Sequence, residues 1–569
     1  MKSLLFSWII SSVFTNISAA TPDWSSSATL PKGETRSDIY GYGENLEKIK
    51  KEGYLLALKW PVEVTGLVVP YEPLKYFLEA PKNPLRNLME RVAEAKLGYT
   101  DLDGMYEWLG LNIYPKNDAV SAVHRIPYPT DNQSYPDFRM GASLIRTPHA
   151  PNSTGLTFSC ATCHSGTFMG KAVMGLTNKR PRANEFFVLA KNYVPMIPSG
   201  FFRVATNATI EEKEMFSRTK ENLKYVGSVS PQVLGLDTSL PHVALSLHKR
   251  KGDEYASKVP LSRYERRRRG KHKLEDFVAD SKPMPWWNLK YKTRWLSDGS
   301  IVAGNPILTN FLWNEVGRGT DLHELETWMK TNKETIKKLT AMAFANKAPR
   351  WTDFFPEETI DLASAQRGEK VFNQSCKRCH GQYEKRWSEV SSEEYDQWSL
   401  SELIETTRVT YHEKTPVKDV GTDPQRWQAT ETFADALNQL AISKWMKTTV
   451  EPQEGYVPPP LEGIFLRYPY FHNNSVPNLC ALMEKVEDRP KRFVQGPSFE
   501  EEDYDRDCVG YPVGDQIPRH WWKERGAIFD TSKPGLRNIG HTKMFWTSDG
   551  KRRHTERQRS DLLMYLKTL

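Results

Sequence analysis

Apolar side chains recur at helical spacing in several stretches of the chain, and turn-forming residues separate these stretches. This spacing, with a helix-favouring composition, predicts helices over residues 211–222, 324–346 and 398–407, and an amphipathic stretch over 71–97. Strand-like alternation of apolar and polar positions is scarce. We therefore predict a mainly α protein with long irregular connections.

The pentapeptide Cys-x-x-Cys-His occurs twice. Its two copies consist of Cys160, Cys163 and His164, and of Cys376, Cys379 and His380. This is the attachment sequence of c-type haem, in which two thiols form thioethers to the porphyrin and the adjoining imidazole binds the iron. Zinc is the alternative, because Cys-x-x-Cys also forms half of many tetrahedral sites. The histidine after each pair favours two covalently bound haem c groups.

The second motif follows a predicted helix over residues 361–372, which places Ala365, Gly368 and Phe372 on one face. Because Gly368 has no side chain, another helix can approach it closely. This arrangement resembles the first helix of class I cytochrome c domains, which crosses the last helix of the domain. Residues 556–569 match that last helix, with an apolar stripe of leucines.

The first twenty residues have the layout of a secretory signal peptide, with Lys2, an apolar run and small residues up to Ala20, where we predict cleavage. No later segment approaches the ~20 apolar residues of a membrane span. These features predict a periplasmic or secreted protein. The net charge is +8, and its densest source, residues 263–273, is either a solvated loop or a docking site for an acidic partner. Export argues against a nucleic-acid partner.

Two cysteines, Cys480 and Cys508, lie outside the haem motifs. In an oxidising compartment we expect them to form a disulfide, and two separate buried thiols are the alternative.

Three segments in the last part of the chain, residues 458–479, 489–496 and 529–541, carry a further resemblance. With the haem motifs they resemble the di-haem cytochrome c superfamily, which contains bacterial cytochrome c peroxidases, MauG and the rubber oxygenases. The resemblance covers about residues 135–569. It implies two class I cytochrome c-like haem domains, which we place at residues 131–345 and 346–569, after a signal peptide (1–20) and an N-terminal extension (21–130).

The resemblance also implies a division of labour between the haems. The haem on His164 is then the reactive centre, and the haem on His380 relays electrons. In the rubber oxygenases a Gly-His motif supplies the second axial ligand of the relay haem, and His541 matches it, although the usual GHxxG pattern is not kept. His472 and Met544 are the other candidates.

For the reactive haem we predict no strong second protein ligand. An iron with one protein ligand can bind O2 or peroxide, whereas a bis-imidazole iron suits electron transfer. The candidates that would contradict this prediction are Met169, Met174, His149 and His242.

Residues 285–299 are rich in tryptophan and in basic residues. Trp286, Trp287 and Trp295 are candidates to relay electrons or to shape a distal pocket, and packing in the core is the alternative for each. The basic residues of this segment, and two more upstream, could bind haem propionates or lie in solvent; they are Lys290, Lys292, Arg294, Lys179 and Arg182. A calcium ion between the haem units could involve Asp298 or Asp321.

The functional hypothesis is an oxidoreductase that uses O2 or H2O2 at the His164 haem. Its partner is either an apolar organic substrate, as for a dioxygenase, or a small periplasmic electron donor, as for a peroxidase. The alternative is a non-catalytic di-haem electron carrier in which both irons have two protein ligands.

Overall fold

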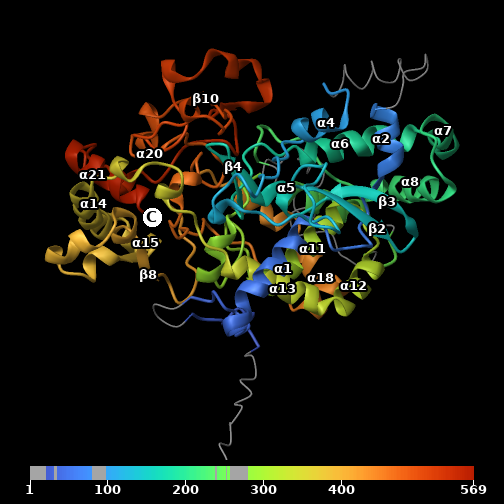
Figure 1. Ribbon diagram of the computed structural model, residues 1–569, viewed down its shortest axis with the longest axis horizontal. Helices are drawn as coiled ribbons and strands as arrows, with labels where there is room; N and C mark the ends of the chain where they lie inside the picture. The colour runs from blue at the N-terminus through green and yellow to red at the C-terminus, as the bar shows by residue number, and fades with distance from the viewer. Residues whose placement is uncertain (1–20, 31–34, 80–97, 237–239, 251–252, 257–279) are drawn as a thin grey trace, which may run out of the picture.

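The computed structural model describes residues 21–30, 35–79, 98–236, 240–250, 253–256 and 280–569 (Figure 1). The predicted signal peptide and the basic run 263–273 lie outside the described residues, as does the second half of the stretch 71–97. The mainly α prediction agrees with the described structure, in which the sheets have two or three strands each.

The helices are distributed along the whole chain. Their bounds are α1 Leu46–Leu58, α2 Tyr71–Glu79, α4 Leu102–Trp108, α5 Ala161–His164, α6 Ala183–Tyr193, α7 Ser199–Ala205, α8 Ile210–Asn222, α9 Leu240–Lys249, α11 Pro306–Gly317, α12 Leu322–Thr331, α13 Lys333–Ala345, α14 Leu362–Ser375, α15 Lys377–His380, α16 Leu400–Leu403, α17 Gln425–Gln428, α18 Ala434–Gln439, α19 Ala441–Met446, α20 Leu479–Leu482 and α21 Glu556–Lys567.

Short strands form one three-stranded sheet, in the order β1-β3-β2, and several antiparallel pairs. Their bounds are β1 Val69–Pro70, β2 Ala142–Thr147, β3 Ala150–Phe158, β4 Ser165–Phe168, β5 Lys171–Met174, β6 Ile301–Ala303, β7 Gln382–Lys385, β8 Thr406–Thr410, β9 Thr449–Val450, β10 Arg492–Val494 and β11 Ile528–Asp530.

The predicted helices 211–222, 361–372 and 556–569 are confirmed as α8, α14 and α21. The predicted helix 324–346 is two helices, because the chain leaves helical geometry at Asn332 between α12 and α13. The prediction for 398–407 was wrong beyond its first turn: α16 is four residues long, and the chain then enters β8, which pairs with β7. Local composition favoured a helix there, and pairing with a distant strand overrode it.

The helices α14 and α21 pack against each other at one end of the molecule (Figure 1). A Cβ atom placed on Gly368 would lie 1.9 Å from the backbone oxygen of Asp561, so only glycine permits this approach. The carboxylate of Asp561 in turn accepts hydrogen bonds from Arg367 and Ser364 of α14. The crossing expected of a class I cytochrome c unit is therefore present at the second motif, with α15 directly after α14.

The first motif has different surroundings. Its single helical turn, α5, lies between the hairpins β2–β3 and β4–β5, and the backbone N–H of Gly175, just after β5, donates to the carbonyl of His164. Only turn-forming residues are evident from the sequence in this region, and the hairpins were not predicted. Their strands alternate poorly because both faces are largely buried.

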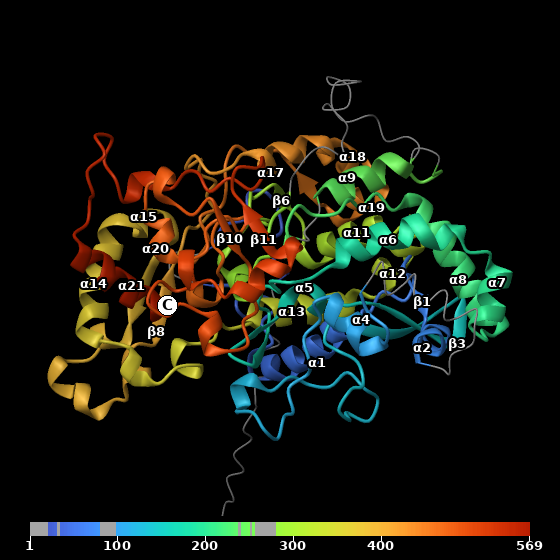
Figure 2. The same ribbon diagram turned by 90° about the horizontal axis from the view of Figure 1, so that it is seen from above.

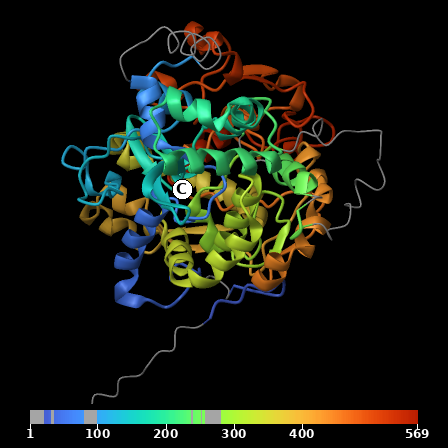
Figure 3. The same cartoon turned by 90° about the vertical axis from the view of Figure 1, so that its right-hand side faces the viewer.

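The described part of the molecule has two large hydrophobic cores and one small cluster, and each large core takes segments from both halves of the chain. The first joins residues 39–344 to the segment 429–450, and the second joins residues 351–569 to short segments around Phe168 and Leu234. Figure 2 shows α18 and α19 lying with the helices of the N-terminal half rather than beside α14, and Figure 3 views that side of the molecule end-on. The two halves are thus interlocked through their cores.

The N-terminal part of the chain packs on the first core. Helix α1 runs against α13, and a Cβ on Gly53 would lie 2.4 Å from the Cβ of Met342. Trp24 contacts Trp295 and Phe344 edge-on, and the guanidinium of Arg36 lies over the same rings. The domain bounds proposed from the sequence stay predictions.

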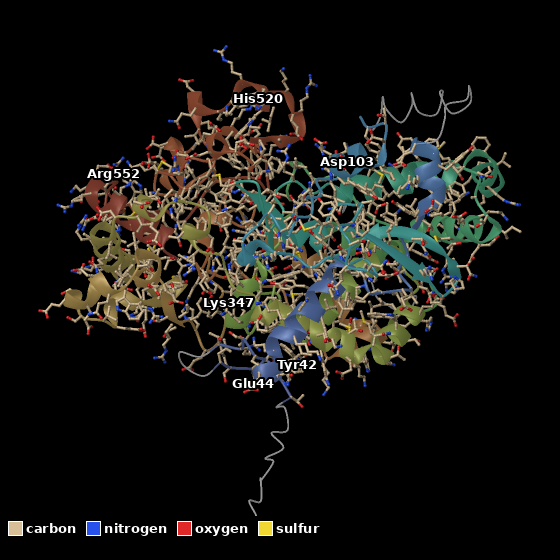
Figure 4. The ribbon with its side chains drawn as sticks, in the orientation of Figure 1. Tyr42, Glu44, Asp103, Lys347, His520 and Arg552 are labelled. Atoms are coloured by element: carbon tan, nitrogen blue, oxygen red, sulfur yellow. A yellow bond between two sulfur atoms is a disulfide. The ribbon has the colours of Figure 1, made fainter. Side chains whose placement is uncertain are left out.

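The disulfide between Cys480 and Cys508 is confirmed, and it links the start of α20 to the loop after Asp505. Among the described residues, no helix combines the length and apolar character that crossing a bilayer requires. Figure 4 places Arg552 at the end of the molecule that carries α14 and α21, and Lys347 near the junction between the two halves.

Candidate haem-binding cavity

Both Cys-x-x-Cys-His motifs open into one continuous cavity of about 1050 Å³. Near the first motif its walls come from α5, α6, α9 and α11, and near the second from α14, α15 and the loops that carry His472 and His541. The residues between the motifs belong to segments 281–297 and 456–472. One space therefore connects the two pairs of cysteines through the interior of the protein.

At the second motif, two histidines face each other. The ring centroids of His380 and His541 are 6.2 Å apart. This separation suits one metal ion between two imidazoles, since each metal–nitrogen bond takes about 2 Å and the remaining distance lies within the rings. His541 has a left-handed backbone conformation with φ 61°, which is uncommon for a non-glycine residue and costs about 1–3 kcal/mol. A strained residue held against His380 indicates a functional constraint.

The tautomer of His380 is fixed by the backbone. Its Nδ1 atom donates a hydrogen bond to the carbonyl of Pro459 over 2.8 Å, which leaves Nε2 available as a metal ligand. Burial lowers the pKa of His380 to about 4 and that of His541 to about 3. Both imidazoles are therefore neutral at physiological pH, which is the form that binds iron.

The two other candidates for the second axial position also line the cavity. The ring of His472 stacks on Tyr456, with centroids 3.8 Å apart. Met544 lies in the short 3-10 turn Thr542–Met544 directly after His541. Among these candidates, His541 is the residue whose ring lies against that of His380.

At the first motif, the nearest ring to His164 among the described residues belongs to Trp286, at 5.3 Å between centroids. Backbone hydrogen bonds set this contact, because Gly175 binds the carbonyl of His164 through its N–H and the N–H of Trp286 through its own carbonyl. Burial lowers the pKa of His164 to about 4 and raises the pKa of the Cys160 thiol to about 12.

The four candidate second ligands for the first haem differ in their position relative to the cavity. The Nε2 atom of His149 lies at hydrogen-bond distance from Glu324, away from the cavity, and neither Met169 nor Met174 lines the cavity. His242 does line the cavity, but its Nδ1 is bonded to the hydroxyl of Ser228 and its Nε2 lies at the backbone of Gly317.

Three methionines that the sequence did not single out, Met284, Met342 and Met483, also line the cavity. The sulfur of Met284 accepts a hydrogen bond from Lys292, and the Cβ and Cγ of Met342 lie against Gly53. None of the three could have been identified from the sequence, since most methionines are core residues.

The three tryptophans have distinct positions. Trp286 and Trp295 line the cavity, whereas Trp287 is fully buried in the second core. The indole N–H of Trp287 donates to the carbonyl of Glu462 over 2.9 Å, and that of Trp295 donates to Gly304 over 3.0 Å. The catalytic roles assigned to them stay predictions.

Of the basic residues considered as propionate partners, Lys292 lines the cavity. Lys290 faces Glu462, Arg294 donates to Gln453, Arg182 pairs with Glu524, and Lys179 lies over Tyr468. Two basic residues that were missed, Lys282 and Arg467, line the cavity beside Lys292. No motif marks them, so only the fold reveals their position.

The acidic residues proposed for calcium have protein partners. Asp298 accepts hydrogen bonds from Arg426, Thr430 and Ser300, and Asp321 caps the start of α12. In the described part of the chain, no three His, Cys, Asp or Glu side chains gather as a metal-binding group. A tetrahedral zinc site is therefore not assembled at either cysteine pair.

Comparison with known proteins agrees with this chemistry. A family model described as RoxA-like, cytochrome c-like matches residues 455–494, which supply Pro459, Arg467 and His472. The uncharacterized protein y4iJ of Sinorhizobium fredii (strain NBRC 101917 / NGR234) is 28% identical over 237 residues, covering 34% of this chain and 36% of that protein. The uncharacterized protein y4iM of the same strain is 26% identical over 251 residues, covering 37% and 49%. The matched regions span less than half of each relative.

Residues 455–494 are therefore similar to part of a cytochrome c-like domain, the class of domain that binds haem c covalently. The matching model is RoxA-like, and the matched segment contributes the carbonyl that orients His380. The interior fits this cofactor, because one cavity meets paired thiols and a half-buried, neutral imidazole at each motif.

Proposed function

We propose that this protein is an exported di-haem c-type cytochrome and an oxidoreductase. In this proposal O2 or peroxide reacts at the haem held by Cys160, Cys163 and His164, and the haem held by Cys376, Cys379 and His380 passes electrons. A haem iron with one protein ligand binds small oxidants, and one with two histidine ligands exchanges electrons without opening a site.

The observation that carries the proposal is the difference between the two motif histidines. His541 lies opposite His380, whereas Trp286 is the ring beside His164 in the described structure. His242 is the candidate second ligand of the first haem that lines the cavity, and its ring nitrogens are engaged by Ser228 and the backbone at Gly317.

The lining near the first motif favours an apolar organic substrate over peroxide reduction. Apolar side chains from α6, α9 and α11 dominate this part of the cavity, among them Phe187, Val243, Ile307 and Phe311. Assisted cleavage of peroxide requires an acid or base beside the oxidant. Among the residues that the structure describes, the lining contains a single acidic side chain, Asp419, and it lies on the loop near the second motif.

A series of one ring contact, two hydrogen bonds and the covalent backbone joins the two motif histidines. Trp286 contacts the ring of His164, and its neighbour Trp287 donates to the carbonyl of Glu462. Pro459, three residues before Glu462 in the sequence, accepts the hydrogen bond from Nδ1 of His380. We propose that Trp286 and Trp287 support electron transfer along this route.

The test is a CO titration of the anaerobically reduced protein, with total haem measured as the pyridine haemochrome. We expect two haems per chain, of which one binds CO, and a mixture of high-spin and low-spin signals in magnetic resonance spectra. O2 uptake with an apolar substrate, compared with H2O2 consumption by the reduced protein, then separates the two reactions. Two low-spin haems without any CO shift would identify an electron carrier and contradict the proposal.

A further inference from the structure

Three cations lie together in the part of the cavity between the motifs. Lys292 ends the 3-10 helix Trp286–Tyr291, whose first residue contacts His164, and Arg467 acts electrostatically on His380. The ammonium group of Lys282 donates to the backbone carbonyl of Arg467. The group therefore reaches from one haem motif to the other.

Lys292 and Arg467 are buried and Lys282 is partly buried, and none of the three has a counter-ion in the described part of the chain. Lys292 is 2% exposed and its ammonium contacts the sulfur of Met284, while Arg467 is 8% exposed and its Nε has no hydrogen-bond partner. The charged groups that act on Lys282 and Lys292 include Arg467 and no carboxylate. In the described structure, four lysines and three arginines line the cavity, against one acidic residue.

Such an arrangement is costly for a protein by itself. Each buried ion carries a desolvation penalty unless an opposite charge lies beside it. This penalty affects the ionisation of Lys292, because burial and then repulsion from Arg467 lower the pKa of Lys292 to about 7. An anion bound among the three cations removes the penalty and restores their ordinary charge.

We propose that Lys282, Lys292 and Arg467 form a carboxylate site that would bind propionate groups of the haems. This inference rests on the proposed function. The propionates are the source we favour, because the cavity continues from this cluster to the cysteines of both motifs and haem carries its carboxylates on the edge away from the thioether-forming vinyl groups.

The test uses the holoprotein and the variant Lys292→Met, which keeps the length of the side chain and removes its charge. We expect full haem content, a lower midpoint potential for at least one haem, and shifted propionate bending bands in the resonance Raman spectrum. Removing a nearby positive charge stabilises the ferric state, which lowers the potential. Lys292→Arg should restore both readings, and Lys282→Met should repeat the effect.

The matched control is Arg294→Met, two positions along the same segment, whose side chain bonds to Gln453 and does not line the cavity. Unchanged potentials and Raman bands in both lysine variants would overturn the inference while leaving the proposed function intact. A shift that occurs only when acetate is added would also overturn it, because the site would then bind a free carboxylate. A wild-type protein without haem would refute the proposed function as well.

Discussion

His541 combines two unusual properties at the residue scale, a ring placed against His380 and a left-handed backbone. The variant His541→Gly separates them, because glycine adopts this φ without strain and removes only the imidazole. We expect the variant to fold and to bind CO at both haems instead of one. CO difference spectra measure this result, and free imidazole should restore the low-spin spectrum.

The control for this variant is His472→Gln, which removes another cavity-lining imidazole and should leave CO stoichiometry unchanged. If the two variants exchanged these outcomes, His472 and not His541 would be the axial ligand.

Trp287 offers a second residue-scale prediction, because its indole N–H is a link in the route between the motif histidines. Trp287→Phe leaves the carbonyl of Glu462 without this donor, and we expect a loss of stability of about 1–3 kcal/mol together with slower electron transfer between the haems. Flash photolysis of CO from the half-reduced protein measures the transfer rate.

Trp295→Phe is the matched control, since it also removes an indole hydrogen bond to a carbonyl, that of Gly304, but lies off the route. Equal transfer rates in the two variants would show that Trp287 is a packing residue.

At the scale of elements, the pair α14 and α21 depends on one missing side chain. Gly368→Ala places a Cβ 1.9 Å from the backbone oxygen of Asp561, which cannot move without separating the helices. We expect destabilisation of about 1–3 kcal/mol, measured by chemical unfolding followed by circular dichroism, and less haem at the second motif.

Gly200→Ala is the control, because a Cβ there meets nothing within 4 Å and Gly200 lies within helix α7. It should raise stability by up to about 1 kcal/mol through helix propensity. Similar losses in both variants would mean that the helices are not held at contact distance by Gly368.

The elements also show what the sequence could reveal. The spacing of Gly368 and Phe372 predicted α14, and the cysteine spacing predicted both motifs, because these signals lie within a few neighbouring residues. The hairpins around α5 and the position of Arg467 depend on hydrogen bonds and contacts between distant segments. No periodicity in a single chain records such contacts, so the cation cluster became visible only in the fold.

The whole molecule places two similar cofactor motifs in one cavity but in different cores. Cys160 packs against the first core and Cys376 against the second. Removing the thiols of one motif should therefore leave the core at the other motif folded. We therefore expect the double variants Cys160→Ala/Cys163→Ala and Cys376→Ala/Cys379→Ala each to fold with one covalently bound haem, as counted by intact mass.

The two single-haem proteins should differ in reactivity. The protein that keeps His164 with its thiols should bind CO and consume O2 when supplied with reductant, whereas the protein that keeps the second motif should remain low-spin because His541 still faces His380. Both retain the Cys480–Cys508 disulfide, whose presence by mass confirms that the last domain has folded. Equal CO binding by the two proteins would mean that the haems at the two motifs are equally accessible to CO. The proposed division between a reactive and a relay haem would then be wrong.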